Sequence, residues 1–140
     1  LAVSQSKDNA VYYIQYAHAR VNRMVDVRAP EKNIAFDRTQ LAHYDVSILV
    51  SNTETELLAK LAAYPEIVAR AANSYEPHQI GNYLKELAAL FHGWYAQDDV
   101  KILDEQNIAL SQARLVLSLN VQQVLKNGLT LLGVSAPESM

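Results

Sequence analysis

The chain has 140 residues, half of them hydrophobic, and a formal net charge of -3 at pH 7. This length forms one domain with its own core, which we assign to residues 1–140. The acidic balance argues against a nonspecific nucleic-acid binder, which is usually strongly basic. The lack of cysteine excludes disulfides and thiolate metal sites, and no apolar run is long enough to span a membrane.

A first helix is predicted from Asn9, a good N-cap, to about Val27, and it should stop before Ala29-Pro30. Its inner face is mostly aliphatic, the adjoining flank carries tyrosine and arginine, and the far side is polar. The inner face comprises Tyr13, Ala17, Val21 and Met24. The flank comprises Tyr12, Tyr16, Arg20 and Arg23, and the far side comprises Gln15, His18 and Asn22.

Rings and guanidinium planes along that flank are surfaces on which unstacked RNA bases stack, and arginine also contacts phosphate. Positive charge is concentrated in residues 1–30, whereas residues 31–100 are acidic. This distribution favours a small, oriented contact with an anion. The alternative is that the tyrosines pack against other helices and that Arg20 is an ordinary surface cation.

Residues 30–52 lack sustained periodicity, apart from one helical turn at 39–43. Thr53-Glu54-Thr55-Glu56 has the pattern of a capping box and should start a helix. The leucines expected to face inward from that helix are Leu57, Leu58 and Leu61.

Three more helices are predicted: a short one from Pro65 through Ala72, a longer one from Pro77, and a last one from near Gln106. Asn127-Gly128 should interrupt the last helix, and Gly133 should end it. The sequence therefore predicts an all-α fold, an antiparallel helical bundle. The helix from Pro77 has apolar or aromatic residues at helical spacing, and the last helix has apolar residues on one side. These sets are Ile80, Leu84, Leu87, Ala88, Phe91 and Tyr95, and Leu110, Ala113, Leu117, Val121, Val124 and Leu125.

No catalytic residue and no metal ligand is predicted. The histidines are dispersed without a second ligand at metal-binding spacing, so each is interpreted as a surface or packing residue: His18, His43, His78 and His92. Asp98 and Asp99 are adjacent, point apart and belong to a solvated loop. No glycine-rich phosphate loop and no nucleophile with a nearby base is present.

Three segments carry a resemblance to a known family. They are Ser6-Lys7-Asp8-Asn9 with Val11-Tyr12-Tyr13-Ile14-Gln15-Tyr16-Ala17-His18-Ala19-Arg20; Ala113-Arg114-Leu115; and Gln123-Val124-Leu125-Lys126-Asn127-Gly128-Leu129 with Leu131-Leu132-Gly133-Val134 and the closing Pro137-Glu138-Ser139-Met140. Together they resemble the C-terminal anticodon-binding (DALR-type) domain of arginyl-tRNA synthetases, which are class I enzymes. The sequence departs from the family in three places: Ala10 replaces a common proline, Ile108-Ala109-Leu110-Ser111 stands where the family has the tetrad Asp-Ala-Leu-Arg, and Ser139 replaces a usual arginine.

The resemblance implies that the chain is part of a cytoplasmic arginine–tRNA ligase. The chain begins at Leu1 and lacks both nucleotide-binding signatures of class I synthetases. We therefore expect an upstream catalytic domain of the same protein to use ATP and magnesium, and this domain to hold no cofactor, to bind no membrane and to be inactive alone.

The resemblance also implies that the first helix, the segment near Tyr95 and the C-terminal methionine face the anticodon loop of arginine tRNA. Met140 should lie near the first helix, with its carboxylate held by a donor. Two alternatives remain: another class I synthetase, such as a cysteinyl enzyme, and a helical protein-interaction module. The expected leading contacts are Tyr16, Arg20, Tyr95 and Met140, followed by Tyr12, Tyr13, Gln15 and His18.

Overall fold

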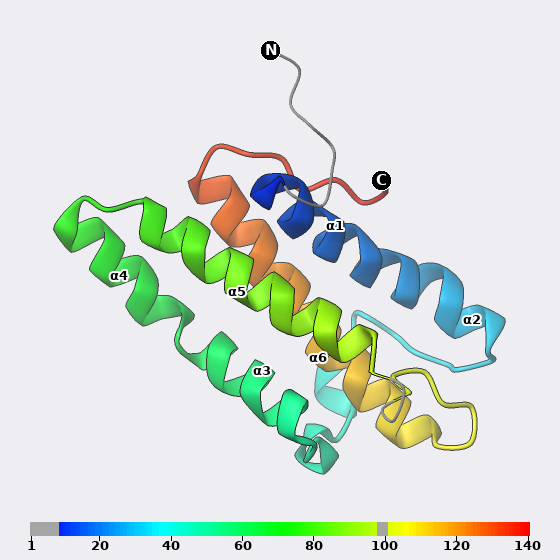
Figure 1. Cartoon of the computed structure of the whole chain (residues 1–140). Helices are drawn as coiled ribbons and strands as arrows, with labels where there is room; N and C mark the ends of the chain where they lie inside the picture. The colour runs from blue at the N-terminus through cyan, green and yellow to red at the C-terminus, as the bar shows by residue number, and fades with distance from the viewer. Residues whose placement is uncertain (1–8, 98–100) are drawn as a thin grey trace.

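The structure, a computed structural model, describes residues 9–97 and 101–140, and every regular element in these ranges is helical (Figure 1). The all-α prediction is confirmed. The first helix, α1, spans Ala10–Arg23, and the Asn9 side chain caps it by accepting hydrogen bonds from the backbone N–H groups of Val11 and Tyr12. The expectations for residues 6–8 and for Asp98-Asp99 lie outside the described residues.

The first helix does not stop before Pro30, so that prediction was wrong. The chain continues from α1 through a π-helical turn, Met24–Arg28, into a final α-helical turn, α2, at Ala29–Glu31. Proline breaks an α-helix because its ring meets the carbonyl of the preceding turn and its N–H is missing. The wider π turn changes that spacing just before the ring, so the helix accommodates proline in its last turn.

Two 3-10 turns, Leu41–His43 and Val46–Ile48, lie in the connection to the next helix. The cap of that helix is Ser51, which forms the capping box with Glu54, two residues before the predicted start. Leu58 is exposed, contrary to expectation, because the helix packs through Leu57 and Leu61 on its other side. The remaining helices are α3 at Asn52–Ala62, α4 at Tyr64–Ser74, α5 at His78–Tyr95 and α6 at Ile108–Leu131.

Gly128 does not interrupt α6, contrary to prediction. A Cβ atom at this position would lie 2.5 Å from a methyl carbon of Leu84 on α5, so glycine allows the two helices to approach closely. Gly133 terminates α6 as predicted: it follows the C-cap residue, Leu132, and has a φ of +73°. The Val134 and Gly133 amides bond back to the carbonyls of Leu129 and Thr130, the pattern of a Schellman C-cap.

The helices form a layered bundle around the central, antiparallel pair α5 and α6 (Figure 1). Helix α1 lies along one side of this pair, and α3 and α4 lie along the other. Residues 32–51 cross the bundle between α2 and α3, so α1 runs in the same direction as α5 (Figure 1). The second halves of α1 and α5 therefore lie side by side, which later places Arg20 against Tyr95.

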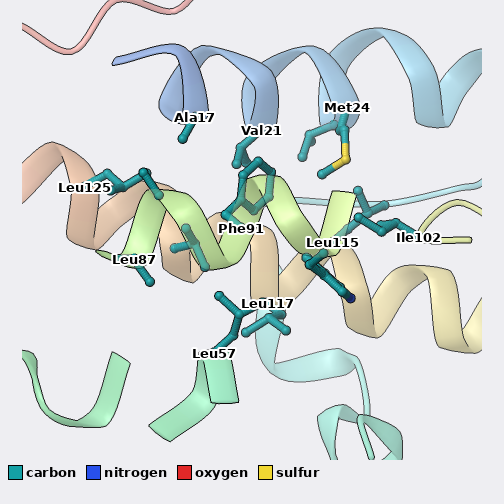
Figure 2. Packing of buried hydrophobic residues seen from close by; sticks show 14 of the residues in the cluster. Ala17, Val21, Met24, Leu57, Leu87, Phe91, Ile102, Leu115, Leu117 and Leu125 are labelled. Atoms are coloured by element: carbon teal, nitrogen blue, oxygen red, sulfur yellow. The ribbon is translucent and has the colours of Figure 1, made fainter. Parts of the chain in front are cut away.

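Apolar side chains from α1, α3, α5 and α6 meet around Phe91 (Figure 2). Phe91 is fully buried, and burial of such a ring stabilises the fold by about 1.5–3 kcal/mol. Helix α1 contributes Ala17 and Val21 to this core, and the π turn that follows it contributes Met24. All three belong to the predicted inner face of the first helix.

A charged cluster also lies inside the bundle. Arg114 Nε donates to Glu54 Oε2 at 2.8 Å, and Trp94 Nε1 donates to the same oxygen at 3.2 Å. The Glu54 side chain is 1% exposed and that of Arg114 is 10% exposed. Because the pair is hydrogen-bonded on several sides, its desolvation is offset, and it connects α3, α5 and α6.

Candidate nucleic-acid interface

Arg20 lies against aromatic rings from two helices. Its Cζ is 4.1 Å from the ring centroid of Tyr95 on α5 and 4.8 Å from that of Tyr16 on α1. Its Nη2 donates to the Tyr16 hydroxyl at 3.3 Å, and Nη1 lies 3.0 Å from His92 Nδ1. Cation–π contact and these hydrogen bonds hold the guanidinium in one orientation. Within the described residues no carboxylate forms an ion pair with Arg20, so its charge has no direct ionic partner there.

His92 is the positioning residue that the sequence interpretation missed. Because Arg20 is the donor, Nδ1 accepts and Nε2 carries the hydrogen, which it donates to the Tyr13 carbonyl at 3.3 Å. Burial is the main cause that lowers the pKa of His92; Arg20 lowers it further, and the bond to Tyr13 acts in the opposite direction. The imidazole is therefore neutral at pH 7 and orients the cation. Its position three residues before Tyr95 was the available signal, since such residues share a helix face.

The C-terminal tail is docked on α1. Gln15 Nε2 donates to the Ser135 carbonyl at 2.9 Å, and His18 Nδ1 lies 2.9 Å from the Pro137 carbonyl. His18 is buried, although the sequence placed it on a polar far side, because the tail and α6 cover this side. Met140 lies beside α1 as predicted, and the donor for its carboxylate stays a prediction.

A groove of about 430 Å³ lies between α1, the end of α5 and the tail. The four leading candidates all line it: Tyr16, Arg20, Tyr95 and Met140. Tyr16 is 37% exposed and Tyr95 is 39% exposed, so both residues are partly accessible. The second cation of the groove, Arg23, was noted on the flank of α1 but was not assigned to the site.

The other four candidates do not line this groove. The Tyr12 ring lies next to that of Tyr16, with 6.2 Å between centroids, and Tyr13 packs against His92 at 4.6 Å. Gln15 and His18 hold the tail. Tyr12 and Tyr13 therefore contact residues that line or position the groove, and Gln15 and His18 hold the tail that lies along it.

Comparison with known proteins identifies the family. The DALR anticodon binding domain matches residues 14–140 of the chain. The chain belongs to this family. Its whole length is 66% identical to the arginine–tRNA ligase of Acinetobacter baylyi and 51% identical to that of Psychrobacter cryohalolentis, of which it covers 23% and 24%. The interpretation of the sequence as an anticodon-binding domain is therefore confirmed.

A solved structure agrees with this relationship. Arginyl-tRNA synthetase of Thermus thermophilus superposes with a TM-score of 0.75 at 30% identity, covering 96% of this chain and 22% of that protein. The chain thus spans less than a quarter of the length of these relatives. None of the helices in the described ranges combines the length and hydropathy needed to cross a bilayer.

Proposed function

We propose that this chain recognises the anticodon loop of arginine tRNA on behalf of an arginine–tRNA ligase. In this proposal the rest of the same protein supplies the chemistry with ATP and magnesium, and this domain supplies recognition. The observation that supports the proposal is the guanidinium of Arg20, which is held against Tyr16 and Tyr95 in a groove and has no direct ion pair within the described residues.

The groove offers the contacts that a splayed-out RNA base needs. A base can stack on the exposed Tyr16 ring, and the Met140 thioether can pack against its other face. The guanidinium fork of Arg20 has five N–H donors, of which the bonds to Tyr16 and His92 occupy two. The others can donate to a base edge or to a phosphate.

The experiment measures binding of the full-length protein that carries this chain to arginine tRNA and to transcripts with altered anticodons. Tyr16→Ala should weaken binding by about 1–3 kcal/mol, the range for loss of one stacked base. Tyr75→Ala is the matched control, because Tyr75 is 91% exposed and does not line the groove.

Equal affinity of the wild-type protein for every anticodon would contradict the proposal. The alternative of a protein-interaction module predicts that Tyr16→Ala leaves tRNA binding unchanged. Circular dichroism of each variant shows whether a loss of binding reflects unfolding.

A further inference from the structure

Helix α1 holds the C-terminal tail at two points (Figure 1). Gln15 Nε2 donates to the Ser135 carbonyl at 2.9 Å, and His18 Nδ1 lies at the same distance from the Pro137 carbonyl. A carbonyl oxygen only accepts, so Nδ1 of His18 carries the hydrogen and donates it. Residues three apart share a helix face, so these two side chains reach alternate carbonyls of the tail.

His18 lies in the interior between the tail and α6. It is 4% exposed, and Gln122 on α6 donates to its backbone carbonyl at 3.1 Å. Burial is the main cause that lowers the pKa of His18, and the bond to Pro137 acts in the opposite direction. Lys126 lowers this pKa further, whereas Glu138 raises it. The imidazole is therefore neutral at pH 7, and its hydrogen bonds to the tail.

One short stretch of α1 thus serves two faces. Tyr16 and Arg20 line the groove, whereas Gln15 and His18 lie outside its lining and contact the tail. Residues 138–140 follow directly after the second point of attachment and line the groove. The structural path from Gln15 and His18 to the groove therefore runs through the tail.

We propose that Gln15 and His18 are positioning residues for anticodon recognition: they bind the tail, not the RNA, and hold residues 138–140 as a wall of the groove before tRNA binds. A tail is normally poorly ordered unless it is tied down, and ordering it on binding reduces affinity. Two bonds to backbone carbonyls order it in advance. The inference rests on the proposed function, since it needs the groove to receive an RNA base.

The test measures binding of the full-length protein to an anticodon stem-loop RNA of arginine tRNA. Gln15→Met and His18→Leu each remove one donor and leave the net charge unchanged at pH 7. The double variant should bind RNA roughly two- to tenfold more weakly, the fold-change that corresponds to loss of the Met140 thioether contact. Deletion of residues 138–140 should have a similar effect.

Two further variants separate the bonds from general packing. Gln123→Met is the matched control for Gln15→Met, because Gln123 on α6 also donates from Nε2, at 2.8 Å, and does not line the groove. It should leave RNA affinity unchanged. His18→Asn should retain more affinity than His18→Leu, because the amide N–H of asparagine can replace that of Nδ1. Equal losses would overturn the role of His18, and Gln15→Met tests the inference at an exposed bond even if His18→Leu does not fold.

The deletion also supplies the decisive comparison. It removes the wall but keeps both points of attachment, so Gln15→Met and His18→Leu should not weaken RNA binding further in the deleted protein. Two sites that act through the same element are non-additive in this way. If the losses persist in the deleted protein, Gln15 and His18 contact RNA directly and the inference is wrong.

A second measurement reports on the tail without RNA. A glutamate-specific protease should cleave after Glu138 faster in the double variant than in the wild-type protein or in Gln123→Met, because a released tail reaches the protease more often. Mass spectrometry measures the rates, and equal rates would overturn the inference. Faster cleavage together with equal affinity of the wild-type protein for every anticodon would show that the hold on the tail is correct and the proposed function is wrong.

Discussion

Two arginines, Arg114 and Arg20, lie in different electrostatic environments. Arg114 is buried, and its charge is balanced by Glu54 at 2.8 Å. Arg20 is half-buried on the surface, and its partners are two aromatic rings and a neutral imidazole. The carboxylate neutralises the first charge, whereas aromatic faces orient the second without neutralising it. An arginine held in place but not neutralised remains available to an anion.

The largest effect is expected from breaking the buried pair. Arg114→Met leaves the Glu54 carboxylate buried without its cation, which should lower the free energy of unfolding by about 3–5 kcal/mol. Urea denaturation measures this change. Adding Glu54→Gln to Arg114→Met should recover part of the loss. If Arg114→Met is as stable as wild type, the contrast between the two arginines is wrong.

Arg20→Lys tests the other side of the comparison. Lysine keeps the charge but lacks the planar fork that bonds to Tyr16 and His92. We expect tRNA affinity to fall by about 1–3 kcal/mol, the range for one stacked or charge-assisted contact. The urea midpoint should stay close to that of wild type. A large loss of stability with unchanged affinity would make Arg20 a packing residue.

The tail should have a smaller effect. Deleting Ser139 and Met140 removes one wall of the groove but leaves the bonds from Gln15 and His18 to the tail. We expect the free energy of tRNA binding to weaken by about 0.3–1.5 kcal/mol, the range for a thioether–aromatic contact. Aminoacylation by the full-length protein should fall with it. The melting temperature should not change. Unchanged aminoacylation would remove Met140 from the site.

The smallest effect concerns pH. Burial lowers the pKa of His92 and of His18 in the folded chain, so below about pH 6.5, the ordinary histidine pKa, the unfolded chain binds more protons. Stability should therefore be constant above that pH and fall as pH decreases through the folded-state values. In His92→Gln this fall should be shallower. Because His92 accepts a hydrogen bond from Arg20, the orientation of Arg20 should loosen in the pH range in which His92 is protonated.

The sequence interpretation succeeded where local patterns decide structure. The cap at Asn9, the termination of the last helix at Gly133 and the aliphatic face of the first helix follow from local residue patterns alone. The family followed from the long motif that ends at Arg20, and the comparison confirmed it. The four leading candidates share one groove, but their contact with tRNA stays a prediction.

Two of the incorrect predictions concern contacts between distant segments. Gly128 looks like a helix breaker until Leu84 is placed against it, and His18 looks exposed until the tail covers it. Pro30 was expected to end the helix because the π turn before it has no clear local signal.

The sequence by itself determined the helical fold, the family and the residue types available for recognition, because these depend on periodicity, capping and motif. Only the tertiary structure decided which arginine forms an ion pair with a carboxylate. Arg20 and Arg114 are both arginines on helices, and their difference arises because α1 runs parallel to α5 while α3 brings Glu54 to α6. Packing over long sequence separations sets these partners, and local residue patterns do not encode it.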